Sequence, residues 1–198
     1  MASPTKKMQY VRLGNSGLKV SKIILGCMTY GSPEWQKWVL SEEEGIKHIK
    51  FAYDQGIQSF DTANVYSNGL SEIILGKAIK QLKLPRDEIV VMTKLYEAER
   101  WNTGNRQKVC GSISYFQTPA EHPLLHRVEE IAKKKGVGMA QISVAWSLSK
   151  DGVSAPIVGT TSLKNLEEMI DAIHIKLTEE EVKYLEEPYC PVPIAGHN

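Results

Sequence analysis

Residues 60–72 read FDTANVYSNGLSE, and this stretch decides the fold that the sequence predicts. A short apolar run ends at its first residue, and an acid, a phenol, a glycine and a helix start follow. Residues 90–94, VVMTK, repeat the pattern with a lysine leaving the end of a strand. A β/α barrel places the polar groups of its active site just beyond the carboxyl ends of its strands. The pattern therefore predicts a proton-transfer site made of Asp61, Tyr66 and Lys94, although the three residues could equally only satisfy one another at the strand ends.

Helices and strands alternate along most of the chain, which favours βα units and a parallel sheet. Residues 8–20 are typical of a hairpin that turns at residues 14–17. Helix starts are expected at Ser41 and Ser71, and further helices from about residue 123 onward. The expected strands of the sheet span residues 22–25, 57–60, 88–93 and 154–158.

Length and composition favour one ordinary globular domain. The chain has 198 residues, 42% of them hydrophobic and 24% charged. A net charge of +1 provides no electrostatic reason to expect nucleic acid or an anionic membrane as a partner. Neither a secretory apolar segment nor a bilayer-spanning one is apparent. Cys27, Cys110 and Cys190 are odd in number and widely spaced, so we expect no disulfide framework, no metal site and a cytoplasmic protein.

The residues after the last expected strand are candidates for binding a phosphate. No glycine-rich dinucleotide or P-loop pattern is present. Barrels can instead bind phosphate at a loop and helix N-terminus that follow their last strands. Gly159-Thr160-Thr161-Ser162 fits that position, and an ordinary N-cap by Ser162 is the simpler alternative. Gly26 would similarly let the backbone approach a ligand, or would only make a turn.

The order of helices and strands is interrupted after Lys94. Residues 98–119 show neither a convincing strand nor a long helical pattern, and the helical pattern resumes at about Pro123. A structureless stretch of this length counts against a complete fold in a compact domain.

The sequence resembles the aldo-keto reductases, and its fungal aryl-alcohol dehydrogenase-like branch looks closest. The resemblance covers residues 8–97 and 120–190, and it rests on five motifs in the family's order: RLGNSGLKVS at 12–21, LGCMTYG at 25–31, FDTANVYSNGLSE at 60–72, VVMTK at 90–94 and PIVGTTS at 156–162. It implies an α/β fold, a (β/α)8 barrel of the TIM type with an N-terminal β-hairpin at its bottom. The region of strands 4–7 is absent, so the barrel is truncated. The expected domain is a single incomplete barrel over residues 1–198, with N-terminal βα units at 8–97, an atypical junction at 98–119 and C-terminal elements at 120–190.

The resemblance implies an NADPH-dependent oxidoreductase that reduces aldehydes or ketones, or oxidises aryl alcohols, by hydride transfer. Tyr66 would be the general acid and base. A free phenol has a pKa of about 10, so it needs a neighbouring ammonium to become an efficient acid at neutral pH. Lys94 would supply that ammonium, and Asp61 would hold it in place.

The resemblance also implies a set of cofactor-binding residues. Those expected at the nicotinamide end are Gly26, Cys27, Met28 and Asp61, and those around the adenosine 2′-phosphate and adenine are Gly159, Thr160, Thr161, Asn165 and Glu168. Thr161 and Asn165 stand where many relatives have arginine or lysine, and Lys164 is nearby. The sequence therefore leaves NADH open as an alternative to NADPH.

The absence of the region of strands 4–7 leaves the expected catalytic activity open. The family's catalytic histidine lies in that region, and none of His122, His126, His174 and His197 has the matching context. Two alternatives to the enzyme therefore stay open: a non-catalytic nucleotide- or partner-binding remnant, and an unstable truncated product. For the enzyme, the expected partner is a small carbonyl or alcohol substrate. The open barrel edges would also allow self-association.

Overall fold

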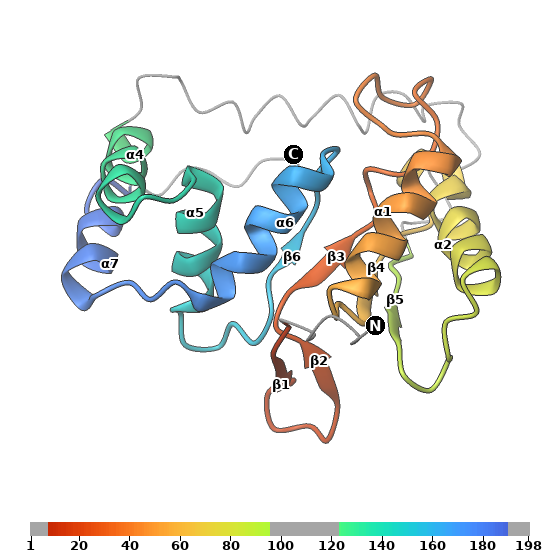
Figure 1. Ribbon diagram of the computed structural model, residues 1–198, viewed down its shortest axis with the longest axis horizontal. Helices are drawn as coiled ribbons and strands as arrows, with labels where there is room; N and C mark the ends of the chain where they lie inside the picture. Colours follow the sequence, from red (N-terminus) through yellow and green to blue (C-terminus); the bar gives the residue numbers. More distant parts are fainter. Residues whose placement is uncertain (1–7, 96–122, 190–198) are drawn as a thin grey trace, which may run out of the picture.

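The computed structural model describes residues 8–95 and 123–189, and its centre is a parallel sheet of four strands (Figure 1). The strands are β3 (Ile24–Gly26), β4 (Ser59–Asp61), β5 (Val90–Met92) and β6 (Ile157–Val158). Their order is β5-β4-β3-β6, so the last strand in the sequence lies beside the first strand of the sheet. Leu25 on β3 faces Phe60 on one side and Val158 on the other. The α/β sheet predicted from the sequence is confirmed, with shorter strands than expected.

Three helices cover one face of this sheet: α1 (Glu42–Asp54), α2 (Leu70–Gln81) and α6 (Leu163–Asp171) (Figure 1). Alternate residues of a strand point to opposite faces, and Leu25, Phe60 and Val158 point toward the helices. They form one apolar cluster with residues of all three helices, chiefly Ile49, Ile74, Leu75, Leu166 and Ile170. This cluster ties the N-terminal βα units to the last strand and its helix.

An antiparallel hairpin lies at the amino ends of the strands. It consists of β1 (Tyr10–Arg12) and β2 (Lys19–Ser21). The hairpin contacts residues at or just before the start of β4. The Tyr10 hydroxyl donates to the Gly56 carbonyl at 2.8 Å, and the Ser21 amide donates to the Ser59 Oγ at 3.3 Å. The hairpin therefore occupies the end of the sheet opposite to the predicted site, as the family resemblance implied.

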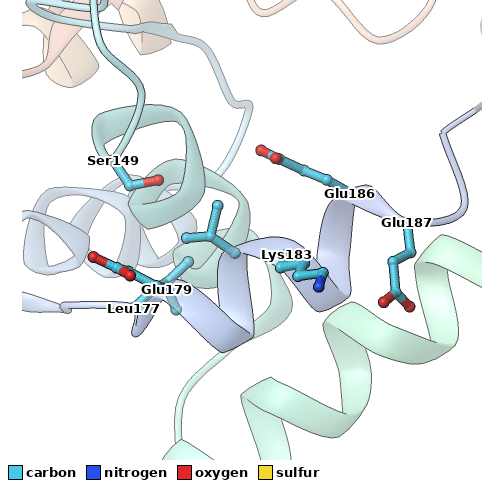
Figure 2. A pocket seen from close by; sticks show the side chains of 7 residues that line it. Ser149, Leu177, Glu179, Lys183, Glu186 and Glu187 are labelled. Atoms are coloured by element: carbon cyan, nitrogen blue, oxygen red, sulfur yellow. The ribbon is translucent and has the colours of Figure 1, made fainter.

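The remaining helices form a second apolar cluster. They are α4 (Pro123–Lys135), α5 (Met139–Leu148) and α7 (Glu179–Glu186), while a 3-10 turn, η4 (Ala172–His174), continues α6. Thr178 and Glu181 form a capping box at the start of α7, with bonds of 3.2 and 2.9 Å. A hollow of about 570 Å³ lies beside α7 and includes Ser149, Leu177 and Lys183 (Figure 2). None of the predicted site residues lines it.

His48 on α1 is a buried polar side chain outside the predicted site. The residue is only 2% exposed, and its ring lies edge-on to the Tyr30 ring with 5.6 Å between centroids. Its Nδ1 atom has no hydrogen-bond partner in the structure. Burial lowers the pKa of the imidazole, and the nearby Glu44 carboxylate opposes this only in part.

We expect His48 to make stability pH-dependent. Because its pKa is lower in the folded chain than the ordinary value of about 6.5, the unfolded chain binds a proton first as the pH falls. The contribution of the neutral His48 imidazole to the free energy of unfolding is therefore complete above about pH 6.5. It is lost as the pH falls through the pKa that His48 has in the folded chain. The free energy of unfolding, measured with urea at several pH values, should change less with pH below pH 6.5 in His48→Phe than in wild type. The exposed His126→Phe serves as the matched control, and an equal slope in wild type and His48→Phe would contradict this prediction.

Candidate active site

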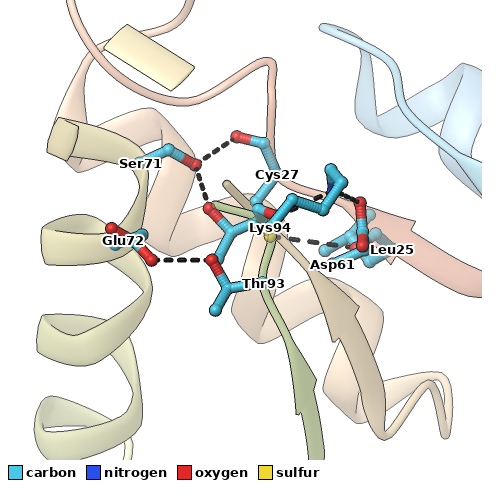
Figure 3. A network of polar contacts seen from close by, with 8 residues as sticks. Leu25, Cys27, Asp61, Ser71, Glu72, Thr93 and Lys94 are labelled. Atoms are coloured by element: carbon cyan, nitrogen blue, oxygen red, sulfur yellow. Dashed lines mark hydrogen bonds and ion pairs between the residues drawn. The ribbon is translucent and has the colours of Figure 1, made fainter. Parts of the chain in front are cut away.

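Asp61 and Lys94 meet at the carboxyl ends of two neighbouring strands. Asp61 ends β4 and lies opposite Met92 on β5, and Lys94 follows two residues later. The Lys94 ammonium donates to the Asp61 Oδ2 at 2.6 Å and to the Thr62 carbonyl at 2.7 Å (Figure 3). The Asp61 side chain is 10% exposed and that of Lys94 is 49% exposed. The pair therefore has a buried acid that holds a cation at the open rim of the sheet.

Tyr66 lies directly beside this cation. It begins η1 (Tyr66–Gly69), a 3-10 turn between β4 and α2, and the Lys94 Nζ lies 4.9 Å from the centre of its ring. Burial lowers the pKa of Lys94, but hydrogen bonding and charge attraction involving Asp61 and Tyr66 outweigh burial, so the pKa is raised. Lys94 is therefore a stable positive charge within reach of a phenol, and the three residues predicted from the sequence lie together.

The turn that carries Tyr66 has an unusual backbone. Ser67 has φ of 48° and Asn68 has φ of 54°, a region that side-chain-bearing residues seldom occupy, and Gly69 follows at 92°. Ser67 is buried against Gly31, where an added Cβ would lie only 1.9 Å from the Ser67 Oγ. Ser67 also accepts a hydrogen bond from the Ser32 amide at 3.3 Å. The loop after β3 therefore fixes the position of the residue that follows Tyr66.

A chain of hydroxyl bonds behind the site was not predicted from the sequence. The Ser71 Oγ donates to the Cys27 carbonyl at 2.7 Å and lies 2.9 Å from the Thr62 Oγ1 (Figure 3). Since a serine hydroxyl has one proton, the Thr62 hydroxyl must be the donor in the second bond. Thr93 likewise donates to Glu72 at 2.7 Å. These bonds join β3, the two strand ends and the start of α2.

The two glycines predicted to meet a cofactor lie side by side. An added Cβ on Gly159 would lie 3.4 Å from the Gly26 carbonyl oxygen, and one on Gly26 would lie 3.1 Å from Ile157 Cγ2. The two glycines therefore end the neighbouring strands β3 and β6, and a side chain on Gly26 would fit more tightly than one on Gly159.

Cys27 and Met28 continue β3 toward the rim. The Cys27 amide donates to the Asp61 carbonyl at 2.7 Å, and the side chain is fully buried. Burial raises the pKa of its thiol well above the usual range, with the Asp61 charge adding to the effect and Lys94 opposing it. Cys27 is thus committed to contacts within the protein, whereas Met28 is half-buried.

The loop after β6 forms the ordinary N-cap that was the simpler alternative. The Ser162 Oγ accepts from the Asn165 amide at 3.4 Å, and the Thr160 Oγ1 accepts from the Ser162 amide at 3.2 Å. The side chain of Lys164 is exposed, 3.8 Å from a Glu168 carboxylate oxygen. This loop lies on the same rim as Asp61, so the two groups of predicted cofactor residues share one edge of the sheet.

Several expectations concern residues outside the described ranges. The junction at 98–119 lies there, as do Cys110, Cys190, His122 and His197. Over residues 8–95 and 123–189, no three or more histidine, cysteine or acidic side chains gather as a metal site would require. In the same part of the chain, no helix is long and apolar enough to cross a membrane.

Comparison with known proteins shows which family the chain resembles. The chain matches the aldo/keto reductase family over residues 22–114 and 105–189. Versiconal hemiacetal acetate reductase of Aspergillus parasiticus is 29% identical over 339 aligned positions, which include 94% of this chain and 98% of that protein. A putative aryl-alcohol dehydrogenase of Schizosaccharomyces pombe is 29% identical over 343 positions, with 94% and 97% covered. Aldo-keto reductase AMT2 of Alternaria alternata is 54% identical over 89 residues, 45% of this chain and 24% of that protein.

A solved structure shows the same fold. A thermostable aldo-keto reductase in complex with the inhibitor epalrestat superposes with a TM-score of 0.66 at 20% identity, covering 92% of this chain and 100% of that one. The sequence alignment with the Aspergillus protein runs over 339 positions, whereas this chain has 198 residues, so it bridges a large internal gap. The chain therefore belongs to the aldo/keto reductase family, in its fungal aryl-alcohol dehydrogenase-like branch, with a TIM-type barrel that lacks its central part.

Proposed function

We propose that this oxidoreductase exchanges a hydride between NADP and a small substrate, reducing an aldehyde or ketone or oxidising an aryl alcohol. One observation carries the proposal. A phenol, an ammonium and a carboxylate, Tyr66, Lys94 and Asp61, lie together at the carboxyl rim of a parallel sheet. That rim is where barrels of this type perform chemistry.

The residues of the chain would control the proton. When bound, a nicotinamide cofactor supplies or accepts the hydride at the substrate carbon. During reduction, the Tyr66 hydroxyl donates its proton to the substrate oxygen as that oxygen gains charge. The phenolate left behind lies next to the Lys94 ammonium, which stabilises it, and Asp61 keeps that ammonium in place. In the oxidation direction, the same phenolate takes the proton from the alcohol.

The strand ends at the rim are the proposed cofactor site. The nicotinamide end would lie beside Asp61, against the backbone of Gly26 and Cys27 and the half-buried Met28, with Gly159 on the neighbouring strand end. The hydroxyls of Thr160 and Thr161 and the N-terminus of α6 would face the adenosine phosphate. Asn165 and Glu168 lie on α6 within its first two turns. The exposed ammonium of Lys164 is the group that would favour NADPH over NADH.

The sequence features also support two coarser proposals. We propose that the chain acts on small carbonyl compounds or alcohols in the cytoplasm, a compartment that suits the odd number and wide spacing of Cys27, Cys110 and Cys190. We also propose that residues 8–97 and 120–190 work as parts of one domain. The apolar cluster that joins β3 and β4 to β6 and α6 supports this.

The cofactor proposal predicts a thermal and chemical stabilisation. A ligand that binds only the folded chain, present at about one hundred times its Kd, should raise the free energy of unfolding by roughly 2.7 kcal/mol. We expect this result with NADPH, and a smaller one with an equal concentration of NADH. Lys164→Ala should reduce the NADPH effect toward that of NADH, while Lys133→Ala, another exposed lysine, should leave it unchanged.

Turnover of an aromatic aldehyde, followed by NADPH absorbance, then distinguishes the candidate functions. Stabilisation together with turnover supports the oxidoreductase. Stabilisation without turnover across a broad aldehyde panel supports a non-catalytic binding protein. An unfolding curve that neither cofactor shifts would contradict the proposed site.

A further inference from the structure

Both outer strands of the sheet have an edge without a neighbouring strand in the described part of the chain. β5 and β6 are the first and last strands of the order β5-β4-β3-β6. In the closed barrels of this architecture, eight strands pair around a circle, so no strand has a free edge. The four parallel strands found in residues 8–95 and 123–189 are half of that number.

The backbone groups that face each free edge can be identified. In a parallel strand, successive residues direct their amide and carbonyl groups to opposite sides. On β5, the Val90 amide donates to the Gln58 carbonyl and the Met92 carbonyl accepts from the Thr62 amide, so both residues face β4. Val91 between them therefore faces outward. On β6, the Pro156 carbonyl accepts from the Ile24 amide at 3.0 Å, so the backbone of Ile157 faces outward.

The face of the sheet opposite to the helices is also incompletely covered. Because Val91 and Val158 pack toward the helices, their strand neighbours point to the other face. Ile157 on that face is 54% exposed, and Val90 and Met92 are half-buried. Apolar side chains on the inner face of a sheet are normally buried within the barrel.

We propose that two copies of this chain complete one eight-stranded barrel. β5 of each copy would pair with β6 of the other around a twofold axis that runs along the barrel. Rotation about that axis keeps all strands parallel. The free edge of β5 in one copy would pair with the free edge of β6 in the other. Since each copy provides four strands, two copies are enough to close a ring of eight. Both free edges and both inner faces would then be buried.

The pairing would also complete the candidate site. Lys94 leaves β5, and β6 of the partner subunit would lie directly beside that strand. The loop from Gly159 of the partner subunit to Ser162 of the partner subunit would therefore form a wall of the site next to Lys94. Each barrel would contain two such sites on one rim.

Sedimentation of the full-length chain over a range of concentrations tests the proposal. We expect a dimer that dissociates on dilution with a cooperative loss of structure. A folded monomer at all concentrations would overturn it, because the edges would then be covered within one chain. Open-ended larger assemblies, or a chain that does not fold at any concentration, would overturn it as well.

Ile157→Pro tests the edge itself. Proline removes the outward amide, while the bond from the Ile24 amide to the Pro156 carbonyl is kept. Because a twofold assembly contains this edge twice, we expect the concentration of half-dissociation to rise about tenfold or more. Ile157→Val keeps the amide and the branched side chain and should dissociate as wild type does. Unchanged association of Ile157→Pro, with an unchanged far-UV spectrum at high concentration, would refute the proposed interface.

Discussion

Replacing Tyr66 with phenylalanine should lower the turnover of an aromatic aldehyde about 10²- to 10⁴-fold, the range that a positioned general acid contributes. The substitution removes one hydroxyl, keeps the ring 4.9 Å from the Lys94 ammonium and leaves the Asp61–Lys94 bond of 2.6 Å intact. The free energy of unfolding should therefore change little, and so should the stabilisation by NADPH. The loss should appear in kcat and kcat/KM together, since the proton is transferred in the transition state.

Tyr184→Phe is the matched control. It removes a phenolic hydroxyl that donates to Glu130 at 2.6 Å, on α7 and remote from the strand ends. It should leave turnover unchanged and affect only stability. Equal turnover in Tyr66→Phe and wild type would show that Tyr66 is not the acid, whatever the cofactor does.

Adding a single methyl group at Gly31 should reduce turnover by about two orders of magnitude, without touching the reacting groups. The new Cβ would meet the Ser67 Oγ at 1.9 Å and the Ser67 Cβ at 2.3 Å, too close for a side-chain rotation to relieve. The backbone of Ser67 must shift and displace the adjacent Tyr66. A misplacement of about 1 Å can cost about 10² in rate. Overpacking of this kind also costs roughly 1–3 kcal/mol of stability.

Gly76→Ala provides the comparison for Gly31→Ala. Gly76 lies inside α2, and an added Cβ would contact nothing within 4 Å. Alanine there should stabilise the chain by up to about 1 kcal/mol through its better helix propensity. Turnover should stay at the wild-type level. If Gly31→Ala retained full turnover, the contact with Ser67 would not position Tyr66.

The positions of Asp61 and Lys94 could be predicted because one residue ends an expected strand and the other follows the next strand, and carboxyl ends of parallel strands lie on one edge of a sheet. In the observed register, the two side chains come within 2.6 Å of each other. The helix starts were less certain. Ser41 occupies the N-cap of α1 but its side chain makes no capping bond, and α2 begins at Leu70, one residue before the expected Ser71. Propensity rules rank residues for a cap, whereas the tertiary contacts of each end decide which one is used.

The features that periodicity could not reveal are the long-range ones. The strand order places β6 next to β3, which depends on the closure of the sheet and not on either segment alone. The positive φ of Ser67 is uncommon for serine, whereas asparagine adopts the positive φ of Asn68 more readily, and Ser67 packs closely against Gly31. Gly31 in the LGCMTYG motif was the available sign, because a glycine before a polar loop often marks a close approach.

The pairing of β3 with β6 has a consequence for the order of folding. Ile24 and Ile157 face each other, so their contact closes a loop of roughly 130 residues, whereas β3, β4 and β5 are joined by short βα connections. The local units should form first and the β6 contact last, since distant pairings gain nothing until the loop entropy is lost. That entropy grows only with the logarithm of loop length, by about 0.6 kcal/mol for each doubling. The internal gap relative to the longer aldo/keto reductases therefore makes this last step slightly easier, even as it removes the neighbouring strands.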